Sequence, residues 1–404
     1  MSAVPSSIGT RTRDWALFSG LVTRGMGHSF LLVALPSLGR RFGFGDLQTG
    51  WLLSLGALGL LLTAPLWGSL AERVGRRRVL LLSLSAASVA PLLYGVLTWH
   101  GLEGGTAPLL LFWLFVGVRG LQALGSSGML PAAQAWIADS TSPEGRTGGM
   151  GFMAAAFGLG GVLGSAVLFA VGGGAPHLGF LLIAGLTAAS LLLCARALAE
   201  PKPPASRGGA GDWSGVSFRG LAPFLGVTFV GVMVYGVIQQ VTGLRLQDDF
   251  GRDPLAAAGL AGGIMMVTAF AMVLAQGVGT RVLRVGPRRL LVGGALLGAL
   301  AMVGLAQSRG LTLFTAAMVS LGFGLGLMLP ANLAAMSLRT GDQGRTAGVN
   351  GAAQALGMVA GPGVGAVLYQ HSTVTPYWAA AVLLCLVVAG SWRGPNRDTQ
   401  GGWT

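Results

Sequence analysis

Charged side chains are scarce in this sequence. Only 10% of its 404 residues are charged, whereas 52% are hydrophobic, and the mean hydropathy is +0.69. A water-soluble chain carries charge at about a quarter of its positions, which it needs to cover its surface. The composition therefore excludes a soluble protein and predicts an exterior in contact with lipid.

Lysines and acidic residues are also few. The chain has 13 acidic and 26 basic residues, and Lys202 is its only lysine. A net charge of +13 would suit a nucleic-acid-binding protein if the basic residues shared one face. Here they fall between apolar runs, so the sequence argues against nucleic acid as a partner.

Cysteines and histidines are too few for a disulfide framework, a metal site or a catalytic set. Cys194 and Cys385 each lie inside an apolar run, without the spacing of zinc ligands. The four histidines form no constellation with a serine and an acid, and no Walker motif for ATP occurs. We therefore predict no metal, no cofactor, no catalytic residue and no enzymatic activity.

Long apolar runs are abundant instead. A membrane-spanning helix needs about 20 mostly apolar residues, and twelve runs meet this requirement. The runs lie near residues 15–38, 48–70, 79–99, 107–137, 148–172, 179–198, 220–243, 255–279, 288–308, 311–337, 346–369 and 376–392. The predicted fold class is an all-α membrane protein with twelve transmembrane helices.

The arginines predict the orientation of the chain, because cytoplasmic loops carry an excess of Lys and Arg. With the N-terminus inside, nineteen basic residues fall in cytoplasmic segments, and five fall in outer loops: Arg40, Arg41, Arg245, Arg252 and Arg309. Both termini are therefore expected on the cytoplasmic side of the inner (plasma) membrane.

An internal repeat relates the first six runs to the last six. A shift of 199 residues places Met129–Ala132 on Met328–Ala331, both of which read Met-Leu-Pro-Ala, and a shift of 211 aligns Gly68–Arg78 with Gly279–Arg289. Transporters built from repeats bind their substrate where the repeats meet, so the pattern predicts a carrier of a small molecule. The predicted parts are an N-terminal six-helix bundle (1–198), a cytoplasmic linker (199–219) and a C-terminal six-helix bundle with a short cytoplasmic tail (220–404).

The loop after the second run carries a recognisable motif. Its sequence, Gly68-Ser-Leu-Ala-Glu72-Arg73-Val-Gly75-Arg76-Arg77-Arg78, resembles the G-x-L-A-D-R-x-G-R-R motif of the major facilitator superfamily. The resemblance extends over essentially the whole chain and implies two pseudo-symmetric six-helix bundles that rock to give alternating access. It also implies a cytoplasmic gate of ion pairs that break when the bundles move. The predicted gate residues are Gly68, Glu72, Arg73, Gly75, Arg76 and Arg77.

The fourth run contains Arg119-Gly-Leu-Gln122-Ala-Leu-Gly125, which is similar to the R-x-x-Q-G-x-G motif of proton-coupled exporters in this superfamily. Ala123 stands where that motif has glycine. An arginine inside an apolar run is costly unless it meets water or a partner, and the repeat has Met318 in its place. We expect Arg119 and Gln122 to act in transport; the alternative is an arginine that only anchors the carbonyl groups of a neighbouring helix.

Glycines in the fifth and eleventh runs resemble the superfamily's antiporter motif. The fifth run has Gly161 where that motif has proline, whereas the eleventh run is nearly complete from Gly348 onward. Glycines at such spacings let helices approach closely, and a proline can bend a helix. The predicted packing and bend residues are Gly357, Gly361, Pro362 and Gly365.

Polar side chains within the runs are the candidate substrate and coupling residues. The resemblance implies that the first, fourth, seventh and tenth helices line the cavity. All acids lie in loops or near the ends of runs, so the candidate proton carriers are His28, which titrates near neutral pH, and Asp46 at an outer helix end. The predicted substrate and coupling set is Arg24, His28, Arg119, Gln122, Tyr235, Gln239, Gln240 and Asn332.

Three functions fit these observations. The favoured one is efflux of a small amphipathic compound or metabolite, in exchange for protons, by a secondary transporter that works as a monomer. Because Arg24 and Arg119 without a buried acid make the pathway electropositive, the alternative is an organic-anion carrier for uptake or exchange. A third reading, a membrane sensor derived from a transporter, lacks the added soluble domain or long tail that such proteins usually have.

Overall fold

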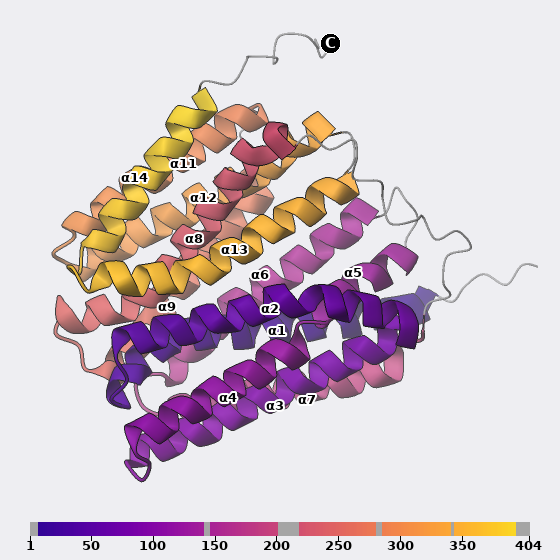
Figure 1. Cartoon of the computed structure of the whole chain (residues 1–404), viewed down its shortest axis with the longest axis horizontal. Helices are drawn as coiled ribbons and strands as arrows, with labels where there is room; N and C mark the ends of the chain where they lie inside the picture. Colours follow the sequence, from indigo (N-terminus) through magenta and orange to yellow (C-terminus); the bar gives the residue numbers. More distant parts are fainter. Residues whose placement is uncertain (1–6, 141–145, 201–217, 280–284, 341–342, 393–404) are drawn as a thin grey trace, which may run out of the picture. The chain divides into compact units, whose positions relative to one another are not determined.

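The computed structural model describes residues 7–140, 146–200, 218–279, 285–340 and 343–392, and the regular structure in these ranges is entirely helical (Figure 1). The helices are α1 Ser7–Arg41, α2 Asp46–Val74, α3 Arg76–Glu103, α4 Pro108–Ser126, α5 Met129–Ser140, α6 Arg146–Val171, α7 Pro176–Ala197, α8 Phe218–Asp248, α9 Pro254–Leu274 with the π-turn η2 Ala275–Gly279, α11 Pro287–Gln307, α12 Leu311–Thr340, α13 Gln343–Tyr369 and α14 Thr375–Trp392.

The twelve predicted spans are confirmed in the described residues. Eleven helical segments are long and apolar enough to cross a membrane, and α14 adds a shorter apolar helix, Thr375–Ser391. The fourth span is α4 and α5 together, Pro108–Ile137. The helices extend beyond the predicted runs because polar residues continue their first and last turns.

Glycine and proline residues determine where several helices begin and end. Pro108, Pro176 and Pro287 occupy the first turn of α4, α7 and α11, where the missing N–H costs nothing. The turn between α2 and α3 is the single residue Gly75, whose φ of 102° is accessible mainly to glycine. Gly128 separates α4 from α5 at a place where an added Cβ would lie 2.7 Å from the Ser83 hydroxyl.

The described residues form two compact units. One unit comprises residues 1–209 together with 253–266, and the other comprises 210–252 together with 267–404. We call them the N-terminal unit and the C-terminal unit. The exact boundaries at 198 and 219 proposed from the sequence stay a prediction.

In the N-terminal unit, α1 packs against α6 and α7, α3 packs against α4 and α7, and α2 packs against α4. The contact of α1 with α6 is made at glycines: a Cβ at Gly25 would lie 2.6 Å from the carbonyl oxygen of Phe157 and 3.1 Å from the Cα of Gly160. Side chains at these positions would push the two helices apart. The fifth span therefore packs closely although its glycine motif is incomplete.

In the C-terminal unit, α8 packs against α13, and α11 packs against α12 and α14. A Cβ at Gly361 would lie 2.8 Å from the Cα of Gly236, and one at Gly357 would lie 2.8 Å from the carbonyl oxygen of Phe229. Gly236 follows Gly25 by 211 residues, the shift that also aligns the loop motif. Both units therefore have a glycine at this matching position in a close contact between two helices.

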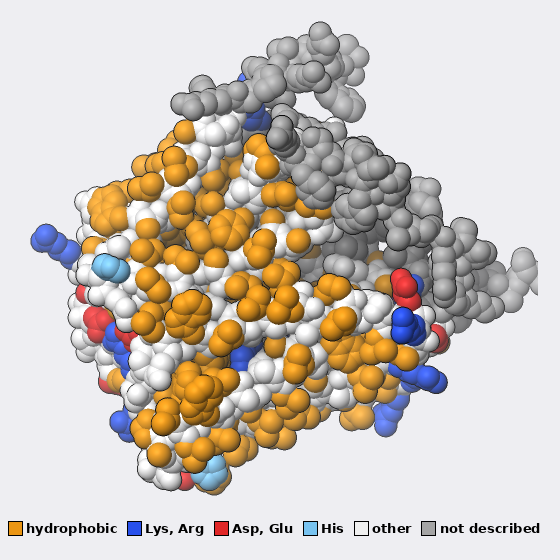
Figure 2. Space-filling view, viewed as in Figure 1, with side chains coloured by type: hydrophobic (Ala, Val, Ile, Leu, Met, Phe, Trp, Pro, Cys, Tyr) orange, Lys and Arg blue, Asp and Glu red, His pale blue; other side chains and the backbone are white. Residues whose placement is uncertain are grey.

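The exterior is apolar, as the composition requires. Leu109, Trp113 and Leu386 are about 60% exposed, at 65%, 60% and 61%. Figure 2 shows a face covered mainly by hydrophobic side chains, with the charged ones mostly near its edges. Such a surface is stable in lipid and not in water.

Candidate substrate and gating sites

The strongest polar feature of the N-terminal unit is a buried pair on α4. Arg119 is 6% exposed and Gln122 is 3% exposed. Nη1 of Arg119 donates a hydrogen bond of 2.7 Å to Oε1 of Gln122, and Nη2 lies 3.3 Å from the carbonyl oxygen of Leu53 on α2. The structure thus brings together the two residues of the predicted motif and adds a contact to a neighbouring helix.

Arg24 and His28 lie one turn apart on α1 and are partly exposed. Within the described part of the chain, Arg24 has no hydrogen-bond or ion-pair partner. It lies within electrostatic range of Arg119, and the positive charges of both arginines also interact with the side chain of His28. The ring centre of His28 lies 5.8 Å from that of Phe157. A proton on His28 would therefore add a third positive charge to the same region.

Asn332, the predicted residue on α12, belongs to a polar cluster of the C-terminal unit. Its Nδ2 donates to the carbonyl oxygen of Phe224 at 2.8 Å and to Oγ1 of Thr228 at 2.9 Å. Thr228 in turn donates to Oδ1 of Asn350 at 2.6 Å. The cluster connects α8, α12 and α13, so Asn332 has a clear structural role between helices.

The three predicted residues on α8 differ in their surroundings. Gln239 and Gln240 are buried, at 5% and 0% exposed, whereas Tyr235 is partly exposed. Tyr235 and Gln239 follow Arg24 and His28 by 211 residues. The repeat thus places neutral side chains in the C-terminal unit where the N-terminal unit has an arginine and a histidine.

The turn between α2 and α3 is held by an acid that the motif does not contain. Glu200, at the end of α7, accepts hydrogen bonds from the backbone N–H groups of Arg76 and Arg77 at the start of α3. The side chain of Arg77 donates to the carbonyl oxygens of Leu198 at 2.7 Å and Ala195 at 2.6 Å. These contacts hold the loop motif against the end of α7.

The other predicted gate residues make fewer polar contacts. Glu72 and Arg73 are exposed, and among the described residues neither makes a hydrogen bond or an ion pair. A Cβ at Gly68 would meet nothing within 4 Å, whereas one at Gly75 would lie 2.8 Å from the Glu200 carboxyl group. Glu200 could not be predicted as a partner of this loop, because it follows the sixth apolar run, far from the motif in sequence.

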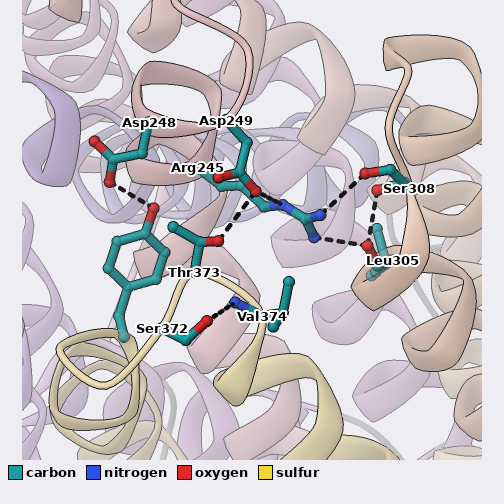
Figure 3. Close-up of polar contacts among 9 residues, drawn as sticks. Arg245, Asp248, Asp249, Leu305, Ser308, Ser372, Thr373 and Val374 are labelled. Carbon is teal, nitrogen blue, oxygen red and sulfur yellow. Dashed lines mark hydrogen bonds and ion pairs between the residues drawn. The ribbon is translucent and has the colours of Figure 1, made fainter.

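A second buried arginine cluster lies in the C-terminal unit (Figure 3). Arg245, which the sequence analysis placed in an outer loop, is 1% exposed, because α8 continues past the apolar run to Asp248. Its Nη1 and Nη2 donate to the carbonyl oxygens of Leu305 at 2.6 Å and Ser308 at 3.1 Å. Its Nε pairs with Asp249 at 2.9 Å.

Aromatic rings complete the surroundings of Arg245. The guanidinium carbon lies 5.3 Å from the ring centre of Phe314 and 4.8 Å from that of Tyr377, both within cation–π range. Asp249 also accepts a hydrogen bond from Thr373. The cluster connects the end of α8 to α11, α12 and α14, and all three guanidinium nitrogens of Arg245 have partners, which marks it as structural.

Asp46, the acid considered as a proton carrier, is paired in the N-terminal unit. Arg40 donates to both of its carboxylate oxygens, at 2.8 and 2.7 Å. Among the described residues, no group of three or more His, Cys, Asp or Glu side chains could hold a metal ion.

Two helical units with a matched glycine contact, and a buried arginine in an apolar span, are typical of a secondary transporter. The model of the Major Facilitator Superfamily matches residues 17–338 and, in a second match, 224–402. The chain therefore belongs to the Major Facilitator Superfamily: it is a multi-pass membrane transporter of small-molecule substrates and not an enzyme.

Relatives match the chain nearly end to end. Multidrug resistance protein 2 of Bacillus subtilis (strain 168) is 26% identical over 399 residues, which cover 95% of each chain. Tetracycline resistance protein, class C, of Escherichia coli is 30% identical over 394 residues, or 91% of this chain and 94% of the relative. The crystal structure of a D-xylose-proton symporter superposes with a TM-score of 0.74 at 17% identity, covering 95% of this chain and 97% of that one, which confirms the fold.

Proposed function

We propose that this transporter exports a small amphipathic compound from the cell in exchange for protons. The observation that carries the proposal is the buried Arg119–Gln122 pair of α4, which matches the motif of proton-coupled exporters in all but one position. Ionisable residues within spans often mark the pathway of a substrate or an ion. The names of the relatives, a multidrug and a tetracycline resistance protein, support the same direction, because a carrier can confer resistance by removing the drug.

The proposed exporter lies in the inner (plasma) membrane with both termini in the cytoplasm, as the distribution of arginines indicates. In this orientation the turn held by Glu200 and Arg77 is on the cytoplasmic side. We propose that this turn belongs to the cytoplasmic gate and that its contacts to the end of α7 rearrange when the two halves rock.

The proton carrier that we propose is His28. An imidazole can take up and release a proton, and the ring of His28 lies within electrostatic range of Arg24 and Arg119. A His28→Asn variant should therefore still exchange labelled compound across the membrane by counterflow but lose its response to a pH gradient. If His28→Asn keeps that response, His28 is not the carrier.

The experiment is expression in a bacterial strain that lacks its own major exporters, followed by susceptibility tests over a panel of antibiotics, dyes and organic acids. The proposal predicts raised resistance to at least one amphipathic compound and lower cellular accumulation of it. Arg119→Met introduces the residue type found at the repeat counterpart, Met318. This variant should abolish the gain in resistance when its level in the membrane equals that of the wild type. Unchanged susceptibility over the whole panel, with the protein present in the membrane, would contradict export.

A further inference from the structure

Two guanidinium groups lie within the spans of the N-terminal unit without a negative partner, that of Arg119 buried and that of Arg24 partly exposed. Arg119 on α4 and Arg24 on α1 are within electrostatic range of each other, and no described carboxylate forms an ion pair or hydrogen bond with either. Positive charges in an apolar region are costly unless they are paired. Their proximity adds repulsion to that cost, so the arrangement favours a negatively charged ligand.

The hydrogen bonds of the two arginines are also incomplete. A guanidinium has five N–H donors and no acceptor. Arg119 uses Nη1 on Gln122 and Nη2 on the carbonyl oxygen of Leu53. Its Nε is buried and makes no hydrogen bond in the described structure, and the neutral Tyr94 side chain lies beside the guanidinium. Arg24 makes no hydrogen bond in the described structure. The region therefore has donors in excess, and a ligand that binds there must bring acceptors.

Gly56 on α2 holds a place open for the guanidinium of Arg119. A Cβ atom at Gly56 would overlap the Nε and Cζ atoms of Arg119. The guanidinium therefore lies against bare backbone, one turn from the Leu53 carbonyl that accepts from it. This fit, together with the bond to Gln122, gives the charged group a defined position, which a binding site requires.

The C-terminal unit has no such charge at the matching positions. Tyr235 corresponds to Arg24 at the shift of 211 residues, and Met318 corresponds to Arg119 at the shift of 199. The buried arginine of the C-terminal unit, Arg245, has its partners within the protein. The donor excess at Arg24 and Arg119 thus has no counterpart at the repeat-related positions of the C-terminal unit.

We infer that Arg24 and Arg119 form an anion-binding site in the N-terminal unit and that the exported compound carries an anionic group, such as a carboxylate, which binds there. Gln122 and Gly56 are positioning residues for Arg119. The inference rests on the proposed export function, whose substrate class it narrows to amphipathic anions. A carboxylate fits because its two oxygens accept from a guanidinium in a bidentate manner.

The binding experiment uses the purified full-length protein and two probes of nearly the same shape, salicylate and salicylamide, which differ in having a carboxylate or a neutral amide. Thermal unfolding and calorimetric titration measure binding. Sodium chloride and sodium sulfate are tested in the same way, to compare inorganic anions with the organic probes. Salicylate should raise the unfolding temperature and bind with a measurable Kd, and salicylamide should not. Salicylamide binding as tightly as salicylate would overturn the inference.

Variants locate the site. Arg24→Gln and Arg119→Met should each weaken salicylate binding by at least about tenfold, because each removes charge-assisted hydrogen bonds. Arg252→Gln, which removes an exposed positive charge from an outer loop, is the control and should leave the Kd unchanged. If all three variants bind salicylate like the wild type, the anion does not bind at these arginines.

Gly56→Ala tests the positioning role, because it keeps every charge. It should weaken salicylate binding, whereas Gly117→Ala on α4, where a Cβ would meet nothing within 4 Å, should not. If Gly56→Ala fails to fold, Arg24→Gln on a different helix still tests the site. Equal Kd values for a folded Gly56→Ala variant and the wild type would show that Gly56 does not position Arg119 for binding.

The remaining outcomes separate this inference from the export proposal. Saturation by chloride or sulfate with no competition from salicylate would overturn the assignment to the exported compound. Export of only neutral compounds, unaffected by Arg24→Gln, would also overturn the anion site while leaving export intact. Salicylate binding that depends on Arg24 and Arg119, in a protein that exports nothing, would support the anion site and contradict the export function.

Discussion

Arg119 and Gln122 face each other across one turn of α4, joined by a hydrogen bond of 2.7 Å from Nη1 to Oε1, and both side chains are buried. Gln122 offers an acceptor but no charge. The pair therefore orients the guanidinium without neutralising it, which leaves its positive charge available to a ligand.

A change of Gln122 to glutamate tests this relationship. Gln122→Glu supplies the missing negative charge beside Arg119, so it should raise the midpoint of thermal unfolding while abolishing salicylate binding. Gln122→Leu, the matched control, removes the acceptor and should lower the free energy of unfolding by about 1–3 kcal/mol. A Gln122→Glu variant that binds salicylate like the wild type would contradict the role that we assign to the uncompensated charge.

The hydrogen bonds that Glu200 accepts at the start of α3 can be tested separately. Glu200→Ala removes the acceptor of two backbone N–H groups at the start of α3, which should cost about 1 kcal/mol, the usual value of an N-terminal cap. Glu103→Ala at the other end of α3, where an exposed acid has no partner in the described structure, is the control and should change little. Equal melting curves for both variants would mean that Glu200 does not hold this turn.

Arg245 should be essential for the stability of the C-terminal unit. Arg245→Met removes three hydrogen bonds, of which the one to Asp249 is also an ion pair, and two ring contacts. It leaves Asp249 without its cation, so we expect a loss of about 3–5 kcal/mol. Arg252→Met, at an exposed position seven residues later, is the control. Urea or thermal unfolding of both variants in detergent gives the comparison, and a stable Arg245→Met protein would show that the cluster is dispensable.

The close contact of α8 with α13 can be tested in the same way. Gly361→Val would force a side chain against the backbone of Gly236 and should destabilise the protein by about 1–3 kcal/mol, as overpacking usually does. At Gly351, on the same helix, an added Cβ meets nothing within 4 Å, so Gly351→Val is the control. Equal stability of the two variants would mean that the helices can separate at little cost.

The twelve spans and the Arg119–Gln122 pair could be predicted from the sequence because both depend on local patterns. Apolar runs of about 20 residues predict spans, and a spacing of three residues puts two side chains on one helical face. The ends of helices were harder to predict. Arg245 was assigned to a loop because the apolar run ends before it, although its interactions with Leu305, Ser308 and Tyr377 keep the helix intact and the arginine buried.

Contacts between distant segments could not be predicted. The motif favoured Glu72 as the acid of the gate, yet Glu200, 124 residues from Arg76, accepts the backbone N–H groups there. Gly56 has no recognisable sequence signal either, since it is one of 69 glycines, and its role is visible only when Arg119 lies across it. Such roles depend on three-dimensional proximity, which one sequence does not encode in any local pattern.

Export in exchange for protons can be measured in inside-out membrane vesicles that contain the protein. Respiration acidifies the vesicles, and a pH-sensitive dye reports the internal proton concentration when the compound identified by the susceptibility tests is added outside. We expect an immediate loss of the pH gradient in wild-type vesicles, because protons leave in exchange for the compound, and no loss with Arg119→Met. Accumulation of the compound that leaves the proton gradient untouched, and that persists when the gradient is abolished, would contradict proton exchange.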